Sequence, residues 1–138
     1  MTRTRPCAAL APGASEGAVR TASGKTITVT LMPNPSYLEF VGAVVDGRAR
    51  AEQTNRRSRE AHHDYSAALP VVIHGDAAFA GQGVVAETLN LGALKGYDTG
   101  GTLHLITNNQ VGFTTDWQDG RSTTHASGAT QRPRASTP

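Results

Sequence analysis

The pattern of apolar and polar positions divides the chain into five sections. Residues 1–24 are rich in Ala, Gly, Ser and Arg and have no periodic pattern, so we expect no fixed structure there. Residues 25–52 have the pattern of a strand, a turn and a helix, and residues 53–68 form a charged loop. Residues 69–115 carry the strongest pattern, whereas residues 116–138 are polar and are again expected to lack fixed structure. The ordered part predicted from the sequence is therefore residues 25–115, with the charged loop inside it.

The section over residues 25–52 begins with alternating β-branched residues over Thr26–Leu31, which predicts a strand. Two prolines then end it, because proline donates no backbone hydrogen bond and restricts the residue before it. Ser36 and Glu39 have the spacing of a capping box, in which each side chain bonds the backbone amide of the other residue. The apolar positions that follow share one helical face: Leu38, Val41 and Val45. The sequence therefore predicts a helix that starts near Ser36.

The section over residues 69–115 has the pattern of a strand–helix–strand unit. The apolar run Leu69–Ile73 is typical of a strand that is buried on both faces of a parallel sheet. A turn of small residues leads into a helix over about residues 83–94, and Thr102–Thr107 is a second β-branched strand. The helix residues available to face the sheet are Val85, Thr88, Leu89 and Leu91. Because the crossover is long enough for parallel pairing, we predict an α/β fold with an incomplete parallel sheet flanked by helices.

Polar side chains follow both of these predicted strands. Asp76 comes three residues after Ile73, and Asn109 comes two residues after Thr107. Since ligands bind beyond the carboxyl ends of parallel strands, both side chains are expected at one edge of the sheet. One carboxylate and one amide oxygen suit Mg²⁺, and the small residues around Asp76 would let the backbone approach a phosphate. The alternative is an ordinary Gly-Asp turn with an N-cap, followed later by a polar Asn-Asn turn.

Composition and charge exclude several other classes of protein. The formal net charge is +2, and no stripe of Lys and Arg with interleaved aromatic residues is present, which argues against binding to nucleic acid. A lone cysteine, Cys7, cannot form an internal disulfide and fits a reducing compartment. The apolar runs are too short for a membrane span. The pair His62 and His63 has no third metal ligand at a useful spacing, so a solvated loop is the favoured interpretation.

Longer strings in the chain resemble one family. These strings are Asn34–Glu39, Ile73–Val85, Glu87–Asn90 and Thr107–Thr115. Each closely resembles a motif of the 2-oxoglutarate dehydrogenase E1 component, also called 2-oxoglutarate decarboxylase. The resemblance extends from about Thr21 to Ser127.

The resemblance implies a thiamine diphosphate-binding fold that also needs Mg²⁺. It implies that Asp76 and Asn109 are magnesium ligands, that the backbone carbonyl of Val111 is a third, and that Ala77 lies at the cofactor together with Asp76 and Asn109. It further implies oxidative decarboxylation of 2-oxoglutarate in the tricarboxylic acid cycle and transfer of the succinyl group to the lipoyl-bearing E2 component. Full-length members are expected to be homodimers in the bacterial cytoplasm.

The chain also departs from the family pattern. Tyr37 occupies the position of a family histidine, so no catalytic residue is assigned. Tyrosine can donate a hydrogen bond there but is a poor proton carrier near neutral pH. The alternative is that Tyr37 only packs against other residues of an incomplete domain. Family members are several times longer, and neither the segment with the cofactor-activating glutamate nor a later histidine motif has a counterpart before Pro138.

We therefore expect a fragment that is inactive by itself, from a truncated or frameshifted gene. The alternative is a non-catalytic remnant or interaction module that docks on full-length E1. Because the predicted sheet has open edges and uncovered apolar faces, we expect marginal stability and a tendency to aggregate.

Overall fold

The computed structural model describes residues 15–33, 38–57, 60–80, 83–110, 112, 114–116 and 119. These residues belong to two compact units, of which the first ends at Ser36 and the second begins at Tyr37.

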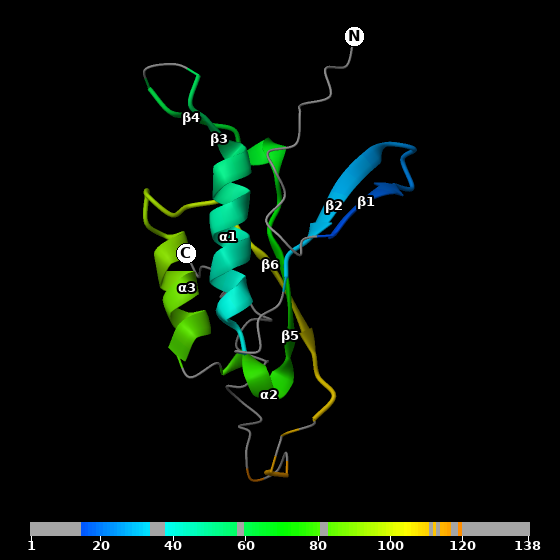
Figure 1. The fold of residues 1–138 in the computed structure, drawn as a ribbon. Helices are drawn as coiled ribbons and strands as arrows, with labels where there is room; N and C mark the ends of the chain where they lie inside the picture. The colour runs from blue at the N-terminus through cyan, green and yellow to red at the C-terminus, as the bar shows by residue number, and fades with distance from the viewer. Residues whose placement is uncertain are drawn as a thin grey trace, which may run out of the picture. The chain divides into compact units, whose positions relative to one another are not determined.

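The first unit is a β-hairpin (Figure 1, blue). Strand β1 (Ser15–Arg20) pairs antiparallel with strand β2 (Thr26–Leu31), so the strand predicted over Thr26–Leu31 is confirmed. In the turn, the amide of Thr21 donates to the carbonyl of Lys25 (2.7 Å), and Gly24 has a left-handed φ of 81°. The expectation of no fixed structure over residues 1–24 is wrong for Ser15–Arg20. Its Gly and Ala residues give a weak strand signal, and pairing with β2 satisfies its backbone groups.

The second unit begins with helix α1 (Phe40–Gln53). The predicted capping box is not the start of this helix, because Glu39 is the N-cap, has a left-handed φ of 69° and makes no side-chain cap bond. Its carboxylate instead bonds the ring of His74, and Ser36 lies outside the described residues. Gly42 and Ala49 are buried on the helix, and a Cβ at Gly42 would lie 3.8 Å from Cγ1 of Val72.

The charged loop predicted over residues 53–68 contains more order than expected. Strands β3 (Thr54–Asn55) and β4 (His62–His63) form a short antiparallel pair, and a 3₁₀ helix η1 (Tyr65–Ala67) follows. The order arises from polar side chains that bond backbone carbonyls, which no apolar pattern could indicate. Gln53, 1% exposed, donates from Nε2 to the carbonyls of Ala68 and Thr99, both at 2.8 Å.

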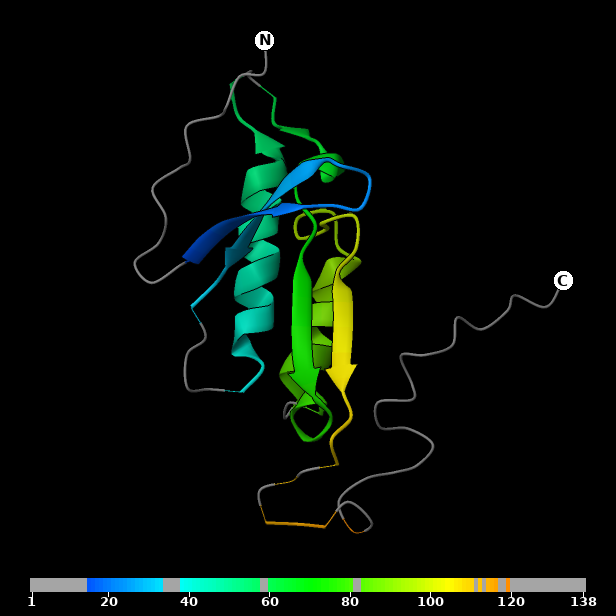
Figure 2. The same cartoon turned by 90° about the vertical axis from the view of Figure 1, so that its right-hand side faces the viewer.

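A parallel strand–helix–strand unit completes the fold, as predicted. Its elements are β5 (Val71–Gly75), α2 (Asp76–Phe79), α3 (Val84–Gly92) and β6 (Leu103–Thr107). Strands β5 and β6 pair in parallel from Val71↔Leu103 to Gly75↔Thr107. Helices α1 and α3 lie on one side of these two strands, as Figures 1 and 2 show from two directions. The structure therefore has the α/β arrangement of a partial parallel sheet.

The prediction that the first strand is buried on both faces is wrong. Along β5, Val72 and His74 are buried, whereas Val71 and Ile73 are 41% and 71% exposed. The helices of the described part of the chain cover one face only, and Ile73 points to the other. In α3, Val85 is buried, as expected for a residue of the covered helix face, but Leu89 is 49% exposed.

Candidate functional site

The carboxyl ends of β5 and β6 form the edge of the sheet at which the candidate metal ligands were predicted from the sequence. Gly75 and Thr107, the last residues of the two strands, are register partners. Asp76 follows Gly75 directly as the first residue of α2, and Asn109 follows Thr107 by two positions. Both strands end beside α2 in Figure 2. The prediction that Asp76 and Asn109 follow neighbouring parallel strands is confirmed, and their role as ligands stays a prediction.

The two candidate ligands differ in their surroundings. Asp76 is only 4% exposed, whereas Asn109 is exposed and its backbone amide donates to the carbonyl of Thr107 (3.0 Å). Gln110, the next residue, has a left-handed φ of 59°, so the chain turns sharply just after Asn109. Val111 and Tyr37 lie outside the described residues.

The donor set at this edge fits a magnesium diphosphate. Mg²⁺ prefers oxygen ligands and keeps several positions for water and phosphate, so one carboxylate and one amide oxygen are a suitable protein share. Ala77 is exposed in the first turn of α2, where backbone N–H groups have no helical acceptor. A Cβ added at Gly75 would meet nothing within 4 Å, so there is open space beside the strand end.

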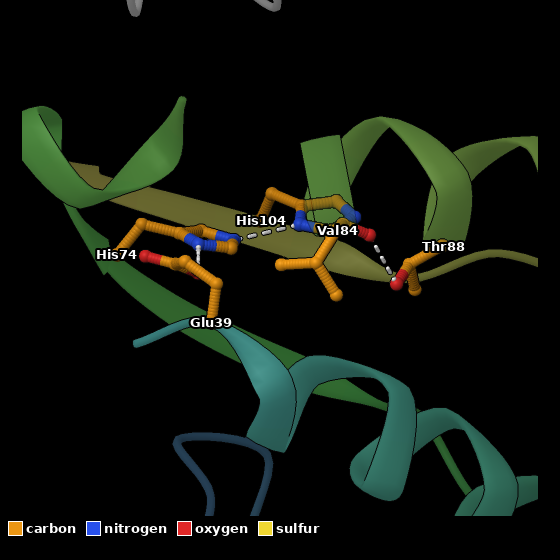
Figure 3. Close-up of polar contacts among 5 residues, drawn as sticks. All are labelled: Glu39, His74, Val84, Thr88 and His104. Atoms are coloured by element: carbon orange, nitrogen blue, oxygen red, sulfur yellow. Dashed lines mark hydrogen bonds and ion pairs between the residues drawn. The ribbon is translucent and has the colours of Figure 1, made fainter. Parts of the chain in front are cut away.

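Three buried or half-buried polar side chains lie on the helix-facing side of the sheet (Figure 3). Nδ1 of His74 lies 2.5 Å from Oε2 of Glu39, and Nε2 of His74 lies 2.8 Å from Nδ1 of His104. The His74 ring is 2% exposed, and it also meets the edge of Phe79 with ring centroids 5.0 Å apart. These contacts link the start of α1, both parallel strands and α2.

The sequence does not predict this network, although it places one histidine in each of the two parallel strands. His74 interrupts an apolar strand, and His104 stands between two leucines in an alternating one. The apolar run before His74 is consistent with a buried position, but the alternation with two leucines predicts that His104 faces outward. In the structure Leu103 and Leu105 are instead the exposed residues, at 46% and 45%. The partner Glu39 could not be found in this way, because the capping-box interpretation gave its side chain another role.

The network borders a pocket of about 200 Å³ between α1, α3 and β6. Asp46 and His104 are its ionisable lining residues, and Thr102 Oγ1 donates to Oδ1 of Asp46 (2.8 Å). Burial raises the pKa of the Asp46 carboxyl, although the Thr102 bond and the His104 charge oppose this shift. Burial lowers the pKa of the His104 imidazole, and the charge of His74 lowers it further.

At the other end of α1, Arg50 connects the helix to β4 and to the segment between α3 and β6. Its guanidinium donates to the carbonyls of Asp98 and Lys95 (3.0 Å for Lys95) and lies 3.1 Å from Nε2 of His63. The amide of Gly100 bonds the Asp98 carboxylate and holds its pKa below the usual value, with help from the Tyr65 hydroxyl. The interpretation of residues 62 and 63 as a solvated loop is therefore wrong for His63, which is half-buried and hydrogen-bonded.

Within the described ranges, no group of three or more His, Cys, Asp or Glu side chains could hold a metal ion. The predicted magnesium set is of another kind, since it has a single carboxylate, an amide oxygen and a backbone carbonyl. No helix in the described part of the chain is long and apolar enough to span a membrane.

Comparison with known proteins identifies the family. The model of the family "Dehydrogenase E1 component" matches residues 13–133. The chain belongs to the dehydrogenase E1 component family. The match includes the hairpin, α1, the parallel strands and both candidate ligands, so the whole described structure is E1 sequence.

The relatives are 2-oxoglutarate dehydrogenase E1 components, in agreement with the resemblance read from the motifs. The chain is 52% identical over 114 residues to the one from Staphylococcus epidermidis, which covers 80% of this chain and 12% of the relative. It is 57% identical over 106 residues to the one from Shouchella clausii, covering 76% and 11%. It is 58% identical over 100 residues to one from Bacillus cereus, covering 72% and 10%. The E1 chain described here thus spans about a tenth of the length of these relatives.

Proposed function

We propose that this chain carries the magnesium-diphosphate anchor of a 2-oxoglutarate dehydrogenase E1 component. The observation that carries the proposal is the parallel register of β5 and β6, from whose adjacent ends Asp76 and Asn109 follow. In the proposal these two side chains and the carbonyl of Val111 bind Mg²⁺. In the proposal the backbone at Ala77 lies against the diphosphate, because N–H groups in the first turn of a helix have no acceptor within the helix.

The chemistry would be divided between the cofactor and the protein. Thiamine diphosphate, when bound, supplies the carbanion chemistry for oxidative decarboxylation of 2-oxoglutarate. The residues of this chain bind and orient: Asp76 provides a negative charge for the ion at a protected strand end, and Asn109 provides a neutral oxygen at the neighbouring one. The metal would thus anchor the cofactor.

The complete reaction belongs to the longer family members. In the proposal, full-length E1 acts as a homodimer in the bacterial cytoplasm and transfers the succinyl group to the lipoyl group of E2. The isolated chain is expected to bind the cofactor weakly and to leave 2-oxoglutarate unchanged. Turnover of 2-oxoglutarate by the purified chain would contradict that expectation.

Calorimetric titration of thiamine diphosphate with Mg²⁺ into the purified chain tests the proposal. We expect a binding heat, and Asp76→Ala should weaken the affinity strongly, because the ion loses its only carboxylate ligand. Glu52→Ala is the matched control, since Glu52 is an exposed acid on α1 that pairs with Arg48 (2.6 Å) away from the strand ends. A chain without binding heat, or an affinity that Asp76→Ala leaves unchanged, would refute the proposed anchor.

A second candidate function is an interaction module that docks on full-length E1. It is favoured by the uncovered apolar face of the parallel pair, where Val71, Ile73, Leu103 and Leu105 are 41–71% exposed. Co-elution of the tagged chain with a full-length E1 component, lost when two of these residues are replaced by Thr, is the expected result for this function. Separate elution at micromolar concentrations would exclude it.

A further inference from the structure

The imidazole of His74 is held from three directions immediately before Asp76 in the sequence. Glu39 lies at one ring nitrogen and His104 at the other, at 2.5 Å and 2.8 Å, and Phe79 packs its edge against the ring (Figure 3 shows the two polar contacts). Because the ring is only 2% exposed, it can turn only if these neighbours move. The His74 side chain is therefore a fixed point at the end of β5.

The Glu39 carboxylate determines which ring nitrogen carries a proton. A carboxylate only accepts hydrogen bonds, so Nδ1 of His74 must be the donor toward Oε2 of Glu39. This holds whether the ring is neutral or charged. Nε2 of His74 in turn forms a hydrogen bond with Nδ1 of His104 on the neighbouring strand. Glu39 thus fixes the orientation and the proton position of His74, and through it the spacing of the two strand ends.

The backbone of Glu39 indicates that this contact is specified by the fold. Its φ of 69° is a left-handed conformation that a residue with a Cβ rarely adopts. Such strained conformations are retained only where the surrounding contacts stabilise them, and they are frequent at functional sites. Here the conformation turns the carboxylate away from the capping position of α1 and toward His74, since no side-chain cap bond forms.

The His74 ring connects this network to Asp76 by two routes. Along the chain, His74 lies in β5 two residues before Asp76, which is the first residue of α2. In space, the His74 ring packs against Phe79, the last residue of α2. Asp76 lies between these two fixed points, so loss of the Glu39 contact would loosen the segment that carries its carboxylate.

We propose that Glu39 is a positioning residue for the magnesium site, which it serves by holding His74, and with it the Asp76 carboxylate, at the end of β5. The proposal rests on the proposed function, in which Asp76 is a metal ligand. Glu39 itself binds neither the ion nor the cofactor. Groups that hydrogen-bond a metal ligand directly typically change affinity about 10- to 100-fold when removed, and Glu39 acts one residue further from the ion, so a smaller change is expected.

The test compares Glu39→Ala, Glu39→Gln and Glu52→Ala in the full 138-residue chain. Glu52 is the matched control because it is an acid on the same helix in an exposed pair with Arg48. We expect Glu39→Ala to raise the Kd for Mg²⁺-thiamine diphosphate several-fold, up to about tenfold. Glu39→Gln should restore part of the affinity, because its amide oxygen can still accept the Nδ1–H of His74, and Glu52→Ala should leave Kd unchanged.

Nuclear magnetic resonance supplies a readout that needs no cofactor. In the unmodified chain, the ¹⁵N signals of the His74 ring should show protonated Nδ1, and Glu39→Ala should shift these signals together with the amide signals of residues 75–79. If Glu39→Ala does not fold, the same comparison is made with Glu39→Gln, for which smaller shifts in the same signals are expected.

The outcomes separate the positioning role from the proposed function. Cofactor binding by the unmodified chain together with an unchanged Kd in both Glu39 variants would overturn the positioning role alone. Absence of binding by the unmodified chain would overturn the proposed anchor. The resonance comparison would then decide separately whether Glu39 holds His74 and the segment that carries Asp76. If the amide signals of residues 75–79 respond to neither Glu39 variant, Glu39 does not position this segment.

Discussion

The side chain of His104 lies between the imidazole of His74 and the carboxyl of Asp46, and its protonation is therefore coupled to folding. Burial and the charge of His74 lower its pKa from the ordinary value of 6.5. The unfolded chain thus binds a proton at this residue at higher pH than the folded chain does. The resulting stabilisation is fully present above pH 6.5 and is lost as the pH falls through the lowered folded pKa.

This coupling gives a pH prediction at the scale of one residue. Between pH 7.5 and pH 5.5, the free energy of unfolding should fall, and His104→Gln should make the fall shallower. Urea unfolding at both pH values measures the difference, with His62→Gln as the exposed control. Asp46, whose raised pKa favours the folded state only at low pH, acts in the opposite direction and at a more acidic range. An equally steep fall in His104→Gln would contradict the assignment.

Single residues also explain which parts of the candidate site the sequence could predict. Asp76 and Asn109 were found because they follow apolar or β-branched strands, and strand ends are where a parallel sheet binds ligands. Glu39, His74 and His104 were missed because their contacts join residues 30 and 35 positions apart. Nothing in the local pattern of either strand specifies such a partner.

At the scale of elements, the strands and helices with strong periodic patterns were predicted well. The parallel pair and α3 follow from apolar spacing and a crossover of sufficient length. The errors have separate physical causes: β1 has a weak strand propensity by itself and depends on pairing with β2, and the start of α1 depends on the contact of Glu39 with His74. Tertiary contacts overrode the local signal in both places.

The junction between α1 and the neighbouring loops depends on the side chain of Gln53. This residue is 1% exposed, and its Nε2 donates to the carbonyls of Ala68 and Thr99. Gln53→Ala leaves the carbonyls of buried Thr99 and half-buried Ala68 without this donor, so we expect a loss of about 1–3 kcal/mol in the free energy of unfolding. Urea unfolding measures it, and the exposed neighbour Glu52→Ala should change stability by less than about 0.5 kcal/mol. Equal effects of the two substitutions would argue against a structural role for Gln53.

At the scale of the second unit, the parallel pair has an uncovered apolar face. Val71 is opposite Leu103 and Ile73 is opposite Leu105 in the register, and all four are exposed. Contiguous apolar patches of this kind promote association, as do the open edges of a two-stranded sheet. The prediction of marginal stability and aggregation from the sequence stays a prediction, but this face gives it a location.

Ile73→Thr tests that location. Ile73 is 71% exposed, so the substitution removes apolar surface from the face while keeping a β-branched residue in the strand. We expect less aggregation, seen as lower light scattering on heating, with little change in the free energy of unfolding. Val85→Thr, at a buried position of α3, is the matched control and should destabilise the chain instead. Unchanged scattering in Ile73→Thr would mean that another surface drives aggregation.

The most direct test of the central claim is a double-mutant cycle between Asp76 and Asn109 for the affinity of Mg²⁺-thiamine diphosphate. If the two side chains hold one ion, each single substitution to Ala weakens binding, and the double substitution costs less than the sum of the two. The coupling energy expected for residues with a shared partner is about 0.5–3 kcal/mol. Losses that simply add, or an Asn109→Ala chain that binds as the unmodified one does, would contradict a shared magnesium site at the ends of β5 and β6.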